Sequence, residues 1–230
     1  MKTFNVSQSI GDIVSIMPKA SEVFKTYHID FCCGGNRPLE EAIKEQGLNK
    51  EEVLEKLEEA YNETKKITNQ VDFRSLSSGE LVDYVVNTHH SYAKKLLPSI
   101  SELATTILRV HGPSHNYLFK IHKLFHELKA ELEQHFIKEE QILFPLIKKY
   151  DDEASSDLFD KVKEVIKETE DEHDAAGDIL KELRKTTEDY KVPDDGCATF
   201  DLTYRQLQDL EGDLFEHIHL ENNILFKRFE

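Results

Sequence analysis

Apolar residues recur every three or four positions along four stretches of the chain, roughly 79 to 110, 115 to 149, 155 to 187 and 199 to 229. This period is that of one face of an α-helix, so each stretch predicts a long amphipathic helix. The stretches are separated by HGPSHN, by Pro145 with the acidic run 151–153, and by KVPDDG, which are typical of breaks between helices. Ser77 and Glu80 have the spacing of a capping box at the start of the first helix. We expect a four-helix bundle.

Shorter apolar patterns come before the bundle, around residues 10–16, 20–27 and 39–42, and a charged helix, KEEVLEKLEEAY, follows them. Between the patterns lies DFCCGGNRP, whose glycines and proline predict a turn. The polar stretch 62–78 has no apolar period and predicts a linker. We therefore expect an all-α chain with a small helical domain over 1–61, the linker, and an up-down bundle over 79–230.

The composition agrees with this organisation and limits the partners. The chain has 230 residues, 32% of them charged, with only 9 Gly and 6 Pro, which favours long solvated helices over sheets. Its net charge of -16 opposes general attraction to nucleic acid or to an anionic membrane. The N-terminus lacks the apolar core of a signal peptide, and no run of about 18 apolar residues follows. We expect a cytoplasmic protein whose partners are proteins or small molecules.

Two segments of the bundle look like copies of one element. Residues 135–145 read HFIKEEQILFP and residues 217–227 read HIHLENNILFK, with His, Glu, Ile, Leu and Phe at the same places. In a projection of about 100° per residue, His135 and Glu139 fall inside the apolar stripe of their helix, and His217 and Glu221 repeat this frame. Buried carboxylates and imidazoles need compensation. A metal cation supplies it, because the i, i+4 spacing lets one helix offer both ligands to one ion.

The other two helices add further histidines. His173 lies on the apolar stripe of the third helix. On the first helix the projection favours His89, whereas the spacing of the two repeats favours His90, and both stay candidates. The stripe used in that projection consists of Leu81, Val85, Tyr92, Leu96 and Leu103.

A single histidine on an apolar face is more often a hydrogen-bonded core residue than a ligand. The order His, His-x-x-x-Glu, His, His-x-x-x-Glu on four helices is much harder to explain in that way. A tetrahedral zinc uses four ligands, so six ligands with two carboxylates that can bridge suit a pair of irons. His219 points off the core stripe, and we expect it at the surface or behind the ligands.

These motifs resemble a known family. HxxxEEQILFP, the EHD before small residues of the third helix, and HxxLENNxLF are similar to the hemerythrin-like domains of the repair-of-iron-centres proteins, the ScdA-type iron-sulfur cluster repair family. The DFCCGG segment resembles the small domain that precedes the bundle in that family. The likeness covers nearly the whole chain.

The resemblance implies a non-haem di-iron protein that restores iron-sulfur clusters damaged by nitric oxide or peroxide. It implies two iron ions, bridged by an oxo group and by the carboxylates of Glu139 and Glu221. It favours His90 over His89, because the family's ligand lies eight residues before a Leu-Pro proline, here Pro98. The implied metal ligands are His90, His135, Glu139, His173, His217 and Glu221.

The adjacent Cys32 and Cys33 match a cysteine pair of that family, and we expect a role in redox chemistry or in iron transfer. Two other interpretations stay open: a buried pair in a tight turn, or a strained and easily reduced disulfide. The 3 cysteines of the chain do not form the disulfide framework of a secreted protein.

Two further functions stay open from the sequence. A hemerythrin-like domain could store or sense oxygen or nitric oxide, and two irons could reduce nitric oxide or peroxide as an enzyme. We prefer delivery or exchange of iron with damaged clusters on client proteins, which is repair rather than turnover. The apolar surface of the small N-terminal module could pack on its own bundle or on a second chain, and we prefer a homodimer.

Overall fold

The computed structural model describes residues 4–64 and 71–230. The chain forms two compact units, Met1–Leu81 with Phe215–Glu230, and Val82–Leu214. Helices dominate both units, and no strand occurs among the described residues, so the expected all-α fold is confirmed. None of the described helices is long and apolar enough to cross a membrane.

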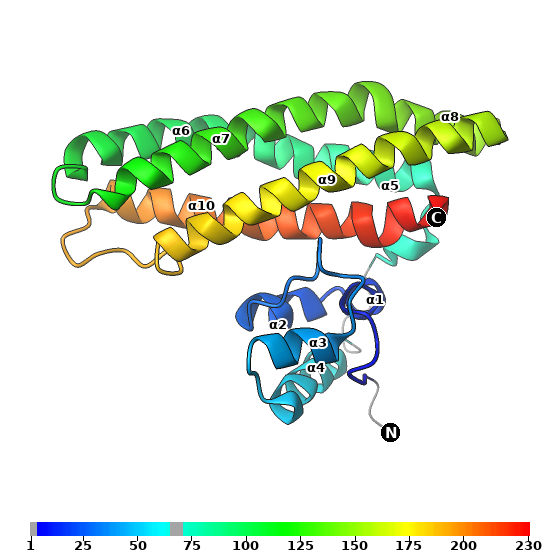
Figure 1. Cartoon of the computed structure of the whole chain (residues 1–230), viewed down its shortest axis with the longest axis horizontal. Helices are drawn as coiled ribbons and strands as arrows, with labels where there is room; N and C mark the ends of the chain where they lie inside the picture. Colours follow the sequence, from blue (N-terminus) through cyan, green and yellow to red (C-terminus); the bar gives the residue numbers. More distant parts are fainter. Residues whose placement is uncertain (1–3, 65–70) are drawn as a thin grey trace. The chain divides into compact units, whose positions relative to one another are not determined.

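The second unit contains most of the bundle. Its first helical stretch consists of α5 (Ser78–Val85), which begins in the first unit, η2 (Val86–His90) and α6 (Ser91–His111). The next consists of α7 (Tyr117–Lys138), η3 (Glu139–Leu143) and α8 (Phe144–Asp152). They are followed by α9 (Ser156–Thr186) and α10 (Ala198–Leu220), and α10 crosses from the second unit into the first. In Figure 1, α6, α7 and α9 run side by side along their length.

Each bundle helix buries one apolar stripe, and polar contacts add to the packing between helices. Arg184 on α9 forms an ion pair with the buried Glu211 on α10, and Ser99 on α6 donates a hydrogen bond to Gln206. Removal of apolar surface from water supplies the main driving force, at about 25 cal/mol per Å². The fully buried core of the bundle includes Val85, Ala93, Leu97, Ile100, Phe125, Leu128, Val162, Leu180, Leu207 and Leu214.

The first bundle helix begins at the predicted capping box. The backbone N–H of Ser77 donates to the Glu80 carboxylate at 2.8 Å, and the backbone N–H of Glu80 donates to the Ser77 hydroxyl at 3.2 Å. Both contacts satisfy amide groups that have no partner inside the helix.

Three π-helical turns interrupt the bundle helices, and they shift the apolar stripes. In a π turn each N–H bonds five residues back instead of four, which adds one residue to the turn. Upstream of η2 the core stripe runs through Leu81 and Val85, but downstream it continues one position later than projected. Tyr92 is 39% exposed, while Ala93 is fully buried. The stripe drawn through Tyr92, Leu96 and Leu103 was therefore wrong: Ala93, Leu97 and Ala104 are the core residues.

Pro145 does not break the second helix, contrary to the expectation. The chain stays helical from Tyr117 to Asp152, and Pro145 lies in the first turn of α8, directly after the π turn η3. Proline is tolerated there because the preceding π turn already interrupts the i→i−4 hydrogen bonds to which the missing N–H would contribute. The acidic run that follows does end the helix, at Asp152.

The first unit begins with four short helices: α1 (Ile10–Ile16), α2 (Ala20–Thr26), α3 (Leu39–Glu45) and α4 (Lys50–Thr64). They enclose one apolar cluster, in which Ile10, Phe24 and Leu57 are fully buried. The end of α10, the π turn η4 (Glu221–Leu225) and η5 (Phe226–Phe229) belong to the same unit, and α1 contacts η4.

The segment expected to be a linker is only partly described. Helix α4 extends beyond the predicted boundary at residue 61, to Thr64, and a short 3-10 turn, η1, spans Phe73–Ser75. Residues 65–70 lie outside the described residues.

Candidate metal centre

Four of the six predicted ligands lie in the second unit. His90 is the last residue of η2, His135 lies in the last turn of α7, Glu139 opens η3, and His173 lies in the middle of α9. All four side chains are buried, and His90 and Glu139 have no exposed surface at all. Three helical stretches thus bring polar groups into an otherwise apolar core.

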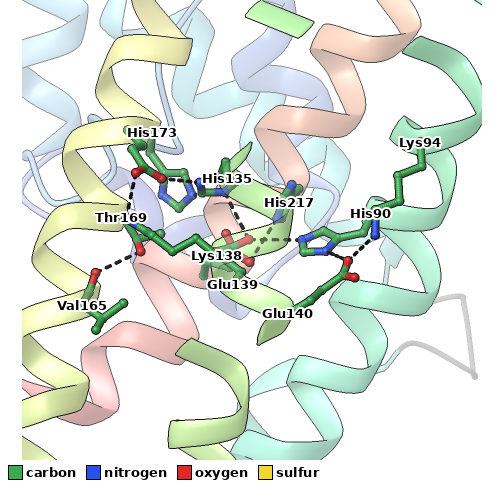
Figure 2. A network of polar contacts seen from close by, with 12 residues as sticks. His90, Lys94, His135, Lys138, Glu139, Glu140, Val165, Thr169, His173 and His217 are labelled. Atoms are coloured by element: carbon green, nitrogen blue, oxygen red, sulfur yellow. Dashed lines mark hydrogen bonds and ion pairs between the residues drawn. The ribbon is translucent and has the colours of Figure 1, made fainter. Parts of the chain in front are cut away.

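The donor atoms of this group converge (Figure 2). The Nε2 atoms of His90 and His135 lie 3.2 and 3.1 Å from the same oxygen, Oε2 of Glu139. The Nε2 atom of His173 lies 3.2 Å from the Nε2 atom of His135. Three imidazole nitrogens and one carboxylate oxygen therefore surround a small volume.

The opposite ring nitrogens of two of these histidines are held by carboxylates. Nδ1 of His90 lies 2.7 Å from Glu140, and Nδ1 of His135 lies 2.9 Å from Glu172. A lysine backs each carboxylate, since Lys94 donates to Glu140 and Lys138 donates to Glu172. These contacts fix the orientation of both rings.

The same contacts shift the pKa of the two carboxyl groups. Hydrogen bonding from His135, assisted by Lys138, lowers the pKa of Glu172 to about 2 against the opposing effect of burial. Burial alone would raise the pKa of Glu140, but the hydrogen bonds from Lys94 and His90 outweigh it and the pKa falls below its usual value. Both groups are therefore ionised carboxylates at neutral pH.

An ionised carboxylate can only accept a hydrogen bond, so the Nδ1 atoms of His90 and His135 carry protons. In a neutral imidazole the Nε2 lone pair then points inward, toward Glu139. Each of these Nε2 lone pairs faces a carboxylate oxygen at about 3 Å. The nitrogen and the oxygen repel each other unless a proton or a cation lies between them. Neutral imidazole with a carboxylate behind it is the usual form of a metal-ligating histidine, and the donor set of this unit fits a cation.

The other two predicted ligands lie in the first unit. His217 is in the last turn of α10 and Glu221 opens η4, with Nε2 of His217 at 3.0 Å from Oε1 of Glu221. Both are buried, at 1% and 0% exposure. The pair has the same i, i+4 arrangement as His135 and Glu139, and in both copies a π turn begins at the glutamate. The repeat seen in the sequence is thus a repeat of backbone geometry as well.

Contacts within the second unit favour His90 over His89. His89 turns to Asp213 on α10, with Nδ1 at 2.9 Å from Oδ1, and stacks edge-on against Tyr84. His90 faces Glu139 instead. The projection selected His89 because it assumed a regular helix through η2, where the π turn moves the inward position on by one residue.

Comparison with known proteins agrees with cation binding by the bundle. Residues 81–229 match the family model described as the hemerythrin HHE cation binding domain, and residues 6–61 match ScdA_N, a domain of unknown function. The chain is 34% identical over 221 residues to the iron-sulfur cluster repair protein YtfE of Enterobacter sp. (strain 638), covering 96% of each chain. The chain belongs to the ScdA/YtfE family of iron-sulfur cluster repair proteins.

Other members of the ScdA/YtfE family show the same extent of similarity. The protein is 29% identical over 220 residues to ScdA of Staphylococcus haemolyticus, with 96% of each chain covered. It is 33% identical over 221 residues to a probable iron-sulfur cluster repair protein of Haemophilus influenzae, again over 96% of each chain. The likeness therefore includes the N-terminal unit as well as the cation-binding domain.

Glu140 and Glu172 contact the candidate ligands, and the helical pattern did not reveal them. Each is directly adjacent in sequence to a predicted ligand, Glu139 and His173, so a projection places it off the buried stripe. The only available signal was an acidic residue beside a ligand. Because acidic residues are common throughout this chain, that signal does not stand out.

His219 is also buried, at 3% exposure, which rules out the surface position, one of the two positions expected for it. Its ring packs edge-on against Phe31 at 5.9 Å between centroids, and burial lowers its pKa to about 4. The residue therefore belongs to the packing between the C-terminal segment and the cysteine loop of the first unit.

The cysteine pair lies in the loop between α2 and α3. Cys32 is buried and Cys33 is partly exposed, and their sulfur atoms are 3.9 Å apart, so no disulfide joins them. The hydrogen bond with Cys33, together with burial, holds the pKa of Cys32 well above its usual value. The third cysteine, Cys197, lies in the second unit directly before α10, so it is not part of this loop.

Proposed function

We propose that this protein repairs damaged iron-sulfur clusters and that a two-iron centre in its bundle supports the repair. One observation carries the proposal: two imidazole Nε2 atoms face one oxygen of the fully buried Glu139, while carboxylates hold the opposite ring nitrogens. Membership of the ScdA/YtfE family adds the reaction class. Buried imidazole and carboxylate donors whose orientation is fixed from behind suit a bound cation.

Six residues would hold the two irons in this proposal. Glu139 and Glu221 would be the bridging carboxylates and an oxo group a further bridge, as the family resemblance implies. The second unit would supply His90, His135, Glu139 and His173, and the first unit would supply His217 and Glu221.

Bound irons would supply redox chemistry and labile coordination positions. The residues of the chain have separate tasks. Glu140 and Glu172 keep the Nδ1 protons of His90 and His135 in place, so that both rings stay aligned as ligands. Lys94 and Lys138 neutralise these two carboxylates near the surface, and the apolar core excludes water around the ligands.

The substrates in this proposal are iron-sulfur proteins whose clusters have been damaged by nitric oxide or peroxide, and iron is delivered to them or exchanged with them. Cys32 and Cys33 assist the transfer of iron or electrons. We place the reaction in the cytoplasm, where thiols are kept reduced. A homodimer is the proposed assembly, and the net charge of -16 makes nucleic acid an unsuitable partner.

A repair assay tests the function. The iron-loaded protein is incubated with a [4Fe–4S] hydratase that nitric oxide has inactivated, and the recovered hydratase activity is measured together with the iron left on the protein. We expect recovery with the unchanged protein and with Glu164→Leu, which alters an exposed glutamate. Glu139→Leu should give little recovery, because it removes a proposed bridging ligand.

The same assay separates repair from the other functions considered. A stable oxygen adduct of the reduced protein without recovery of the hydratase would point to oxygen storage. Repeated consumption of nitric oxide or peroxide with an added electron donor, again without recovery, would point to a reductase. Either result would overturn the repair proposal.

A further inference from the structure

We propose that Asp30, Cys32 and Cys33 form a second metal site in the loop between α2 and α3, for one thiophilic divalent cation, Fe²⁺ or Zn²⁺. One donor atom from each of these three residues lies within 4.8 Å of the other two. The site belongs to the first unit and shares no ligand with the proposed two-iron centre.

The donor distances suit a single ion. Tetrahedral coordination at Zn–S bonds of about 2.3 Å separates two thiolate sulfurs by about 3.8 Å, and a thiolate and a carboxylate oxygen by about 3.6 Å. In the structure, the sulfur atoms of Cys32 and Cys33 are 3.9 Å apart, and the sulfur of Cys32 lies 3.3 Å from Oδ1 of Asp30. Little rearrangement is needed to place a cation among the three donors.

The loop backbone holds these donors in place. Oδ1 of Asp30 accepts hydrogen bonds from the backbone N–H groups of Cys32 and Gly34, at 3.2 and 3.1 Å. The backbone of Gly35 accepts a hydrogen bond from the N–H of Gly11 at 2.7 Å. The loop is thus tied to its own carboxylate on one side and to helix α1 on the other.

Asn223, in the π turn η4, holds the same loop from a third side. Its Nδ2 donates to the carbonyls of Phe31 and Cys32, at 3.2 and 3.0 Å. Gly35 lies so close to this amide that a Cβ there would be 2.5 Å from Oδ1 of Asn223. A fixed backbone lowers the entropy lost when a cation is bound, which favours binding by only three protein ligands.

The chemistry of the donors selects the cation. Two thiolates and one carboxylate bring negative charges together where Cys32 is 2% exposed, and a divalent cation offsets this repulsion. Thiolates favour Zn²⁺ and Fe²⁺ over Mg²⁺ and Ca²⁺, which prefer oxygen ligands. Cys33 is partly exposed, so a water or a ligand from a client protein can complete the coordination.

A role for this site follows from the proposed function and rests on it. If iron passes between the bundle and a damaged cluster, a partly exposed thiolate site on the same chain is suited to hold the iron in transit. The existence of the site does not depend on that role.

The test is a Co²⁺ titration of the reduced, iron-loaded, full-length protein, because Co²⁺ reports thiolate ligation by a charge-transfer absorption band. We expect one additional equivalent of Co²⁺ per chain with this band, and Zn²⁺ should displace it. Asp30→Asn keeps an oxygen that can accept the two loop N–H groups but removes the charge, and should weaken binding by about tenfold or more. Cys33→Ser should abolish the band.

Cys197→Ser is the matched control, because it removes a thiol from the second unit and should leave the titration unchanged. Circular dichroism of each variant checks that it folds. Absence of a further equivalent in the folded protein, or a thiolate band that survives in Cys33→Ser, would overturn the site, and so would an unaltered titration in Asp30→Asn. Hydratase recovery is measured on portions of the same preparations that received no Co²⁺, because Co²⁺ in the site would block iron in transit. A positive Co²⁺ titration with no recovery in the Co²⁺-free portions would overturn the repair function but leave the site standing.

Discussion

The two copies of the ligand motif, residues 135–145 and 217–227, differ in what covers them. In the first copy Ile137 is 47% exposed and Ile142 is 49% exposed. In the second copy the corresponding residues, His219 and Ile224, are 3% and 6% exposed. The His-x-x-x-Glu pair, the proposed metal ligands, is buried in both copies, so the difference lies on the outer side of the helix.

The second residue after the shared glutamate shows the same contrast. Gln141 in the first copy is exposed, whereas Asn223 in the second is buried and binds the carbonyls of Phe31 and Cys32. One copy therefore presents its outer side to solvent, and the other uses it to hold the cysteine loop of the first unit. A duplicated ligand motif can thus keep its inner face and acquire a new role on its outer face.

The inner faces can be compared by removing each glutamate. Glu139→Leu and Glu221→Leu should each lose most of the bound iron, because each glutamate is a proposed ligand of both ions. Metal analysis of the purified variants against the unchanged protein measures this loss. Near-normal iron in either folded variant would show that the assignment of that copy is wrong.

The carboxylates behind the histidines should have the next largest effect. Glu172→Gln removes the charge that orients His135, and we expect iron affinity to fall by about 10- to 100-fold. Glu168→Gln is the matched control, since Glu168 is exposed and contacts the same Lys138 only at 3.7 Å. Competition with a chelator measures both affinities, and equal values for the two variants would contradict the role of Glu172.

The outer faces can be compared by two alanine substitutions. Asn223→Ala leaves two loop carbonyls without their donor and should lower the free energy of unfolding by about 1–3 kcal/mol. Gln141→Ala, at the corresponding exposed position, should change it by less than about 0.5 kcal/mol. Denaturant titration of both variants gives the two values. A loss of equal size would remove the contrast between the copies.

The smallest predicted effect is on the alkylation rates of the thiols. Cys197 serves as a reference thiol outside the loop that holds Cys32 and Cys33. The hydrogen bond with His111 lowers the pKa of Cys197 to about 7, so its alkylation by iodoacetamide should rise with pH through 7 and then level off. Cys32, which is buried and has a raised pKa, should react much more slowly at pH 7. Mass spectrometry of the labelled peptides measures each rate.

Replacing His111 gives the corresponding control. His111→Phe should return the Cys197 pKa toward 9, which cuts the thiolate fraction at pH 7 from about one half to about 1%. The more basic thiolate is also about tenfold more nucleophilic, so the net rate should fall about fivefold. An unchanged rate would mean that His111 does not stabilise the thiolate.

Helical periodicity was sufficient for the fold and for most of the candidate ligands. The apolar stripes placed four helices, and the i, i+4 spacing alone paired His135 with Glu139 and His217 with Glu221. Periodicity failed at the first helix, because a projection at a constant angle cannot include the extra residue of a π turn. The irregular step from Val85 to Ala93 in the core stripe was the available signal.

Contacts that depend on the folded chain were beyond the sequence. Glu140, Glu172 and Asn223 look like ordinary surface residues until a partner from another segment reaches them. The sequence gives no sign that Asp30 contacts the cysteine loop, although it directly precedes Phe31, Cys32 and Cys33. Local patterns report which face of a helix is buried, but not what a polar side chain on the other face will meet.

The π turn η2 decides which of two adjacent histidines the backbone turns inward. On either side of η2 the apolar stripe is regular, and the two stripes are out of phase by one position. A regular helix through the same residues would keep one phase and would give the inward position to His89. One extra residue in a single turn therefore sets the chemical identity of the group that faces Glu139.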